Sequence, residues 1–258
     1  MTSAHRIGVA LAVVLALAAC TGAPVEEEPA ASSTPTNTAS SAEPGTGQPD
    51  PVPGGAPQDG DGSQLDPAEL VAVLTAVDEA ESLNAQVIPD AEIRTREKEA
   101  AQQVAGITVT PEECHAYIES SPDVSEGASR GAMTFAGESS LQPDTVSLSS
   151  FASAEAARAQ VQASRKQLGP CSEFTMDISN QSVRTTVEQI SANTAADETL
   201  ALRTTAQVPG TIQQSITVRA AVGSTVVDVL VGSSTDPEAD VARAEKLTDL
   251  VVAELRLR

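Results

Sequence analysis

The sequence predicts an α+β fold, with a mainly antiparallel sheet of about five to seven strands, flanking helices and one disulfide. Short runs of alternating apolar and polar residues recur between residues 133 and 231, as half-buried strands require. Short turns join these runs, which favours antiparallel pairing. Helical patterns with recognisable start signals lie before, between and after the strands, so we expect the helices to pack on the sheet.

The chain opens with a run that predicts a secretory signal peptide over residues 1–19. The apolar stretch Ile7 to Ala19 follows His5 and Arg6. At about 1.5 Å per residue it reaches roughly 20 Å, short of the ~30 Å membrane core. Its end, Leu17-Ala18-Ala19-Cys20, resembles a bacterial lipobox. The resemblance implies cleavage before Cys20 and a diacylglycerol anchor on its sulfur, with fatty acids such as palmitate. The alternative is an ordinary secreted protein in which Cys20 is unmodified.

Residues 20–64 are predicted to be the lipidated cysteine followed by a disordered linker. From Thr21 to Gln64 the chain is rich in Pro, Ser, Thr, Gly and Ala, and it contains no Lys or Arg. Such a segment buries too little apolar surface to offset its ordering entropy. One domain is then predicted over residues 65–258, a length that suits a single compact unit.

Start and stop signals mark the helices of this domain. Asp66-Pro67-Ala68-Glu69 supplies an N-cap, a proline at the first position and an acid in the first turn. Thr110-Pro111-Glu112-Glu113 predicts a capping box and a short helix that carries Cys114. The other predicted helices are Asp90 to Ala105, Ser153 to Leu168 before Gly169-Pro170, and a last helix from about Asp236 to the C-terminus.

The predicted strands carry apolar or threonine side chains at every second position. Ile212 to Val231 is the clearest hairpin, because its two runs join through Gly223-Ser224, a pair suited to a type II′ turn. The other strand patterns centre on Met133 and Phe135, Val146 and Leu148, Phe174 to Ile178, Val183 to Val187, and Leu200 to Thr204.

Cysteine and charge counts bound the compartment and the partners. Of 3 Cys, the lipid uses Cys20, and Cys114 and Cys171 remain. Outside the cytoplasm such a pair most simply forms a disulfide; the alternative is two free buried thiols. The chain carries 36 acidic against 15 basic residues and no basic cluster, which disfavours nucleic acid as a partner. The same acidic charge would repel the body of the protein from anionic lipid head groups. We therefore expect the acyl chains to attach the protein to the outer face of the cell membrane.

Two motifs suggest nucleophilic chemistry, and both lack its context. Gly127-Ala128-Ser129-Arg130-Gly131 matches G-x-S-x-G, but a polar, turn-like segment precedes it where a nucleophile elbow needs a buried strand. The only histidine beyond the signal peptide, His115, lies upstream rather than downstream of Ser129. Cys114-His115 are adjacent on a predicted helix and point about 100° apart, so they cannot readily act as nucleophile and base. A disulfide with an exposed histidine is the better interpretation.

The remaining candidates are weaker. Asp59-Gly60-Asp61-Gly62-Ser63 begins like an EF-hand loop but lacks its later ligands, and too few Cys and His exist for a zinc site. We therefore expect no metal, no cofactor and no catalytic residues, and the sequence does not assign ligand-binding residues. Other candidates are the acidic pairs Asp78/Glu79 and Asp197/Glu198, and an anion pocket built from Arg130, Arg184, Arg203 and Arg219, with surface placement as the alternative for each.

The C-terminal half resembles a known family. A helix is followed by Gly169-Pro170-Cys171-Ser172-Glu173-Phe174, then by strands, the hairpin SITVRAAVGSTVVDVLVG, and DPEADVARAEKLTDLVVAELRLR. This is similar to the PknH-type extracellular sensor domain, which occurs on actinobacterial serine/threonine kinases and in stand-alone lipoproteins. The resemblance implies an α+β domain with a ligand-binding cleft and no catalytic residues. That family has two disulfides, whereas this chain has cysteines for one.

Together these features predict a lipid-anchored, extracytoplasmic, non-enzymatic binding or sensor module for a small envelope molecule or a signalling partner protein. The alternative is a structural or protein-interaction lipoprotein of the cell envelope. A third hypothesis is an envelope hydrolase, which needs polar groups that converge in a cleft.

Overall fold

The computed structural model describes residues 63–118, 127–137, 142–178, 181–208 and 210–258. They form a nine-stranded sheet in the order β1-β3-β4-β9-β8-β7-β6-β5-β2, and every neighbouring pair is antiparallel. The predicted α+β class, with an antiparallel sheet and flanking helices, is therefore confirmed. The predicted signal peptide, Cys20 and the predicted linker as far as residue 62 lie outside the described residues.

The strands are β1 (Gln86–Pro89), β2 (Thr108–Thr110), β3 (Ser129–Phe135), β4 (Asp144–Ser150), β5 (Glu173–Ile178), β6 (Gln181–Ile190), β7 (Glu198–Val208), β8 (Thr211–Val222) and β9 (Thr225–Gly232). The helices are α2 (Pro67–Glu81), α3 (Asp90–Val104), the 3₁₀ turn η1 (Glu112–Cys114), α4 (His115–Ile118), α6 (Ala154–Gln167) and α7 (Pro237–Leu255).

The strands that the sequence patterns miss, β1 and β2, form the two edges of the sheet. They are 4 and 3 residues long, and each buries a single residue. A segment this short cannot display an alternating pattern, so its pairing with β3 or β5 is decided by the neighbouring strand.

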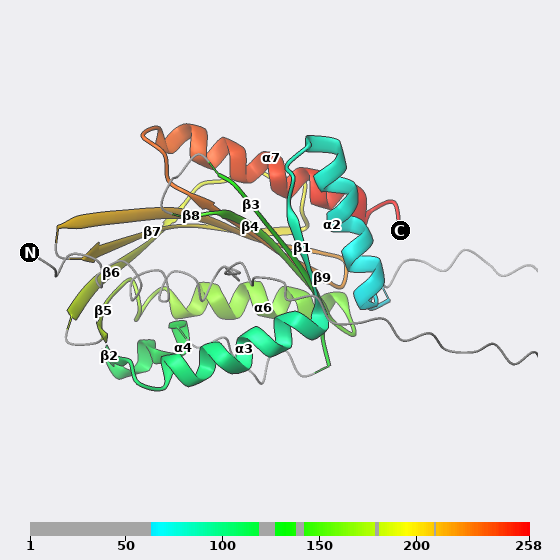
Figure 1. Ribbon diagram of the computed structural model, residues 1–258. Helices are drawn as coiled ribbons and strands as arrows, with labels where there is room; N and C mark the ends of the chain where they lie inside the picture. Colours follow the sequence, from blue (N-terminus) through cyan, green and yellow to red (C-terminus); the bar gives the residue numbers. More distant parts are fainter. Residues whose placement is uncertain (1–62, 119–126, 138–141, 179–180, 209) are drawn as a thin grey trace, which may run out of the picture. The chain divides into compact units, whose positions relative to one another are not determined.

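Two helical layers cover the sheet (Figure 1). α2 and α7 lie on one face, which we call the outer face, and α3 and α6 lie on the other, the inner face. On the outer face Leu74 and Leu247 pack with Met133, Val146 and Val229. On the inner face Val161 of α6 packs with apolar residues of β5 to β9, and Ile93 of α3 packs with Ala132.

The central hairpin β8–β9 sits between both layers. Its turn is Gly223-Ser224, with Val222 paired to Thr225. Gly223 takes φ 51°, a left-handed value that a type II′ turn requires at its first central position and that glycine adopts without strain. The hairpin that the sequence predicts therefore forms at the predicted residues.

Three of the predicted start signals cap the helices that follow them. Asp66 and Glu69 form a capping box on α2, Ser153 caps α6, and Asp236 caps α7. The capping box predicted at Thr110 is wrong. Thr110 pairs with Thr175 as the last residue of β2, and the short helix η1 begins after Pro111 with no side-chain cap. The backbone of Thr110 pairs within the sheet and Pro111 occupies the N-cap position, so Thr110 does not cap the helix.

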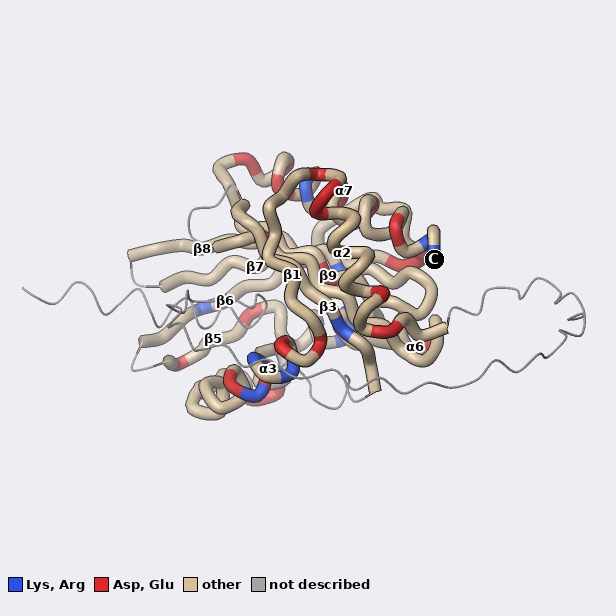
Figure 2. The backbone as a smooth tube through the Cα atoms, turned by 45° about the vertical axis from the view of Figure 1, so that its right-hand side comes forward, with Lys and Arg blue, Asp and Glu red and all other residues tan. Residues whose placement is uncertain are grey.

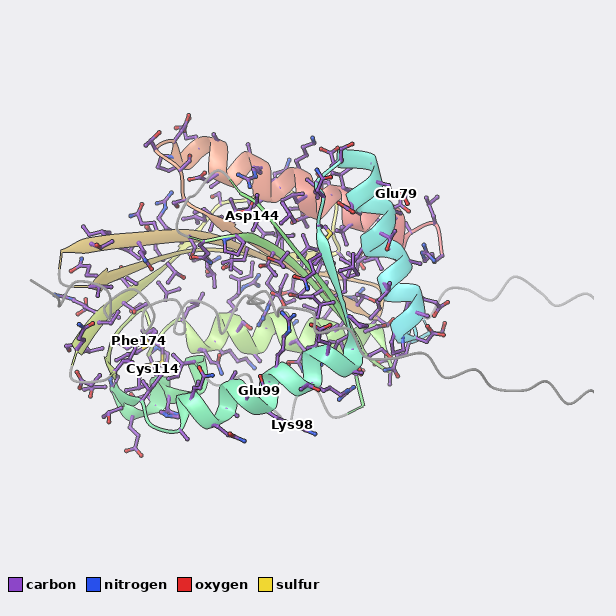
Figure 3. The ribbon with its side chains drawn as sticks, in the orientation of Figure 1. Glu79, Lys98, Glu99, Cys114, Asp144 and Phe174 are labelled. Atoms are coloured by element: carbon purple, nitrogen blue, oxygen red, sulfur yellow. A yellow bond between two sulfur atoms is a disulfide. The ribbon has the colours of Figure 1, made fainter. Side chains whose placement is uncertain are left out.

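The predicted disulfide between Cys114 and Cys171 is present and spans 57 residues. It ties the η1 turn to the start of β5, and both cysteines are buried in the inner-face core with Phe174 (Figure 3). For a loop of this length the chain-entropy model gives about 4 kcal/mol of stabilisation.

The first residues of the domain bond to one end of the sheet. Ser224 donates to the carbonyl of Ser63 at 3.0 Å, and the Leu65 amide donates to Ser150 Oγ at 2.9 Å. The Gln64 side chain donates to the carbonyls of Gly127 and Ser150. The preceding chain therefore joins the domain beside the β8–β9 turn. No helix among the described residues is long and apolar enough to cross a membrane.

A buried ion pair fixes the outer layer to the β3–β4 corner. Asp144 is 0% exposed, pairs with Arg243 of α7 and accepts a hydrogen bond from the Gly232 amide. Gly137 lies against this carboxylate so closely that a Cβ there would overlap Asp144 Oδ1 and touch Arg243. A side chain at residue 137 is incompatible with the ion pair.

We expect Gly137→Ala to lower the free energy of unfolding by roughly 1–3 kcal/mol, because overpacking must displace the Asp144 carboxylate. Urea titration of the full chain measures the change. Gly169→Ala is the matched control, since its Cβ would meet only ordinary contact at 3.9 Å. Equal stability of the two variants would contradict the prediction.

Candidate ligand-binding face

The structure does not form a nucleophile elbow at Ser129. Ser129 begins β3 instead of standing between a strand and a helix, and its hydroxyl lies 3.5 Å from the Gln64 side-chain amide that donates to it. Gly127 adopts φ 93°, as expected for a polar turn that enters a strand. The G-x-S-x-G match therefore lacks the geometry of a hydrolase motif.

The other sequence candidates have structural partners. Cys114 is oxidised in the disulfide and His115 begins α4. Asp78 accepts from the Ala85 amide, and Glu79 points away from the sheet (Figure 3). Asp197 and Glu198 pair with Arg256 and Arg165. In the described ranges no group of three or more potential ligands could hold a metal ion, and the EF-hand-like stretch lies outside them except for Ser63.

The four arginines considered for an anion pocket do not converge on one site. Each is paired with a carboxylate: Arg130 with Glu97, Arg184 with Glu173, Arg203 with Glu188, and Arg219 with Asp228. Strand alternation places Arg130 and Arg219 on the inner face and Arg184 and Arg203 on the outer face. Acidic and basic residues are similarly intermixed along α3 (Figure 2).

The inner face changes character beyond the end that α6 covers. Near the β8–β9 turn its strand residues are apolar, with Ala221 and Val226 packed in the core of α6. Farther along the strands, hydroxyl and amide side chains replace them. We call this region the inner polar face; its residues are Thr134, Thr145, Thr185, Gln213, Ser215 and Thr217.

Strand register brings these residues together. Thr134 lies opposite Thr145, and Thr145 and Thr217 flank Leu230 from neighbouring strands. Gln213 and Thr185 flank Ala206 in the same way. Residues directly opposite each other in antiparallel strands point to the same face. Met133 and Val146 belong to the outer core, so their neighbours Thr134 and Thr145 point inward.

Buried polar atoms on this face have no partner within the described part of the chain. They are the hydroxyl oxygens of Thr134, Thr145 and Thr185 and the amide oxygen of Gln213. Thr145 is 2% exposed and Thr185 is 3% exposed. Leaving a buried hydroxyl or carbonyl without a hydrogen bond costs about 1–3 kcal/mol, and native proteins contain few such groups. Four of the buried polar atoms that lack a hydrogen-bond partner in the described residues therefore lie on this face.

An ion pair marks the border between the apolar and polar parts of this face. Arg219 donates to both carboxylate oxygens of Asp228, at 2.6 and 3.1 Å, and to the hydroxyl of Ser164 on α6. Elsewhere on this side of the sheet, Arg94 of α3 donates to Asp90 at 2.6 Å, and this hydrogen bond raises the pKa of Arg94. The charges along the border are therefore compensated locally.

Sequence reasoning missed this face, although a signal exists. Thr145, Ser147 and Ser149 of β4 alternate with the apolar Val146 and Leu148, and that pattern reads as a solvent-exposed strand face. In the structure Thr145 is buried between Thr134 of β3 and Leu230 of β9. The lateral assembly of strands far apart in sequence creates the cluster, so no local pattern announces it.

Comparison with solved structures identifies the known fold that this architecture matches. The extracellular domain of PknH from Mycobacterium tuberculosis superposes with a TM-score of 0.51 at 15% sequence identity, and the match covers 76% of this chain and 99% of that one. The chain has the PknH extracellular-domain fold. The predicted PknH-like resemblance is thus confirmed at the level of fold.

A second solved structure, an uncharacterized protein from Mycobacterium smegmatis, matches with a TM-score of 0.41 at 14% identity, covering 72% of this chain and 96% of that one. No family model and no curated protein matches the chain.

The stability effect of an unpartnered hydroxyl can be measured directly at Thr185. In the ligand-free protein we expect Thr185→Val to raise the free energy of unfolding by about 1 kcal/mol, because it removes a buried polar atom without breaking a hydrogen bond. Urea denaturation of the full chain gives the value.

Thr248→Val is the control with the opposite expectation. Thr248 is 0% exposed, but its hydroxyl donates to the carbonyl of Ala244 at 2.8 Å. Its loss should cost about 0.5–1.5 kcal/mol. Destabilisation of similar size in both variants would show that Thr185 has a partner after all.

Proposed function

We propose that this protein is a lipid-anchored, extracytoplasmic, non-enzymatic binding module that captures a small molecule of the cell envelope on its inner polar face. The observation that carries the proposal is the cluster of buried polar atoms that have no partner in the described residues. The likeness of its fold to that of an extracellular domain supports the location. The signal peptide and lipobox pattern at Cys20 supports the anchor.

The point of attachment suits such a role. The chain enters the domain at Ser63, which is bonded to Ser224 beside the β8–β9 turn. Gln213 lies near the other end of β8, nine residues from Val222, or about 30 Å at 3.3 Å per residue. The inner polar face therefore lies toward the end of the central strands that is opposite Ser63.

Any signal transfer would pass through a partner protein. The whole chain is acidic, with a formal net charge of −21, so anionic lipid head groups would repel it. Acyl chains on Cys20 then provide the membrane affinity, since two or more chains anchor stably where one binds only marginally.

Substitution of the lipidated cysteine tests the anchor. We expect wild-type protein to incorporate labelled palmitate, fractionate with membranes and lack residues 1–19 in its intact mass. Cys20→Ala should lose the label completely, because no other group can accept the lipid. Cys114→Ala, which removes a different cysteine, should keep the label. Unlabelled wild-type protein that retains residues 1–19 would refute lipidation and cleavage.

Native mass spectrometry tests capture. The full chain, released from the membranes of its own cells in mild detergent, should carry a bound small molecule in a stoichiometric ratio. Heating above the unfolding transition should release it. Protein that is free of any small molecule but bound to a second polypeptide would instead favour the structural or protein-interaction alternative.

A further inference from the structure

We propose that α3 is a strap that opens with rising ionic strength. Its N-terminal half is held to β3 by charged groups and detaches from the sheet, while its C-terminal end stays fixed to the disulfide core. This inference goes beyond the proposed function and does not depend on ligand capture. It follows from the course of α3, from its small apolar contact and from the charges that hold it.

α3 joins the two edges of the sheet. β1 ends at Pro89, where α3 begins, and β2 starts at Thr108, shortly after α3 ends. Because β1 and β2 are the first and last strands of the sheet, α3 runs along the inner face from one edge to the other (Figure 1). Release of either end of α3 therefore frees one edge of the sheet from the other.

The two ends of α3 are held by different parts of the core. Val104, the last residue of α3, belongs to the inner core that also contains Cys114 of the disulfide. Ile93, near the first turn, packs with Ile88 and Ala132 in a separate cluster of three residues. The C-terminal end thus shares the main inner core, whereas the N-terminal half does not.

α3 buries little apolar surface for its length. α2 has the same length of 15 residues and buries four apolar side chains, whereas the buried residues of α3 are Ile93 and Val104. Elements with few buried apolar contacts open at a lower free energy than the whole domain. An isolated helix of this length is marginally stable in water, so the detached part of α3 should lose its helical hydrogen bonds.

Charged groups hold the N-terminal half of α3 to β3. Arg130 of β3 pairs with Glu97, and its backbone amide donates to Asp90 at 3.1 Å. Arg94 donates to Asp90 at 2.6 Å and to the carbonyl of Ala128 at 2.8 Å. We call these four charged residues the α3 latch. The Arg130 side chain is only 7% exposed, so the helix excludes water from its guanidinium group.

The net stabilisation from such a latch is small and depends on salt. A buried ion pair gains attraction but gives up the hydration of both charges, and opening returns that hydration to Arg130 and Glu97. Glu97 and Arg94 are 33% and 41% exposed, so dissolved ions reach the latch in the closed state. The Debye length falls from about 30 Å at 0.01 M salt to about 3 Å at 1 M, which weakens the attraction.

Hydrogen exchange of the full chain, measured by mass spectrometry, tests the strap. After correction for intrinsic rates, we expect the amides of residues 94–104 to exchange at least tenfold faster than those of α2. Raising NaCl from about 10 mM to about 1 M should accelerate α3 roughly tenfold further, because it screens the latch. α2, which is held by apolar contacts, should change less than twofold.

Variants connect the opening to the latch. Glu97→Gln leaves the buried Arg130 without its carboxylate, so we expect α3 to exchange roughly tenfold faster at low salt and to respond less to added NaCl. Glu188→Gln is the matched control, since it removes the partner of Arg203 on the outer face. Its α3 exchange should equal that of the wild type.

Equal exchange rates of α3 and α2, or α3 exchange that does not change with salt, would overturn the inference. Equal acceleration of α2 and α3 by salt would also overturn it, because that result shows general destabilisation. The wild-type salt series stands even when Glu97→Gln fails to fold. In a folded Glu97→Gln protein, unchanged α3 exchange would refute the latch.

Discussion

The double burial of the β8–β9 hairpin is the constraint on which the rest of the structure depends. Val227 and Val229 of β9 alternate with Val226 and Leu230, and all of them are buried although they point to opposite faces. A strand buried on both faces needs a layer on each side. α2 and α7 supply the outer layer and α6 the inner one, while Gly223 fixes the register of the pair.

The two faces of the sheet differ in the partners of their buried polar groups. On the outer face Asp144 is paired with Arg243 and bonded to Gly232, and Thr248 bonds to the carbonyl of Ala244. On the inner face Thr145 and Thr185 are equally buried and have no such partner within the described ranges.

The inner layer contains both the disulfide core and part of the inner polar face. The disulfide, α6 and the apolar residues of β5 to β7 build a closed core around Cys171 and Phe174. Thr185 lies opposite Phe174 within this core, whereas Thr134 and Thr145 lie on β3 and β4 of the same face. Because the attachment point at Ser63 lies at the β8–β9 turn, the polar region is carried at the free end of the central strands.

The sequence by itself determined the helices with capping residues, the long alternating strands, the Gly223-Ser224 turn and the pairing of Cys114 with Cys171. The helices, strands and turn depend on the local spacing of residues along the chain. The disulfide follows from the cysteine count, because only Cys114 and Cys171 remain once Cys20 is assigned to the lipid. Tertiary structure alone decided the edge strands β1 and β2, the failure of Thr110 as a cap, and the inner polar face. The edge strands and Thr110 are decided by pairing with a neighbouring strand, and the inner polar face by the order of β3, β4, β9, β8, β7 and β6 in one sheet. Register across a sheet couples residues as far apart as Thr134 and Thr217, and no local periodicity encodes that coupling.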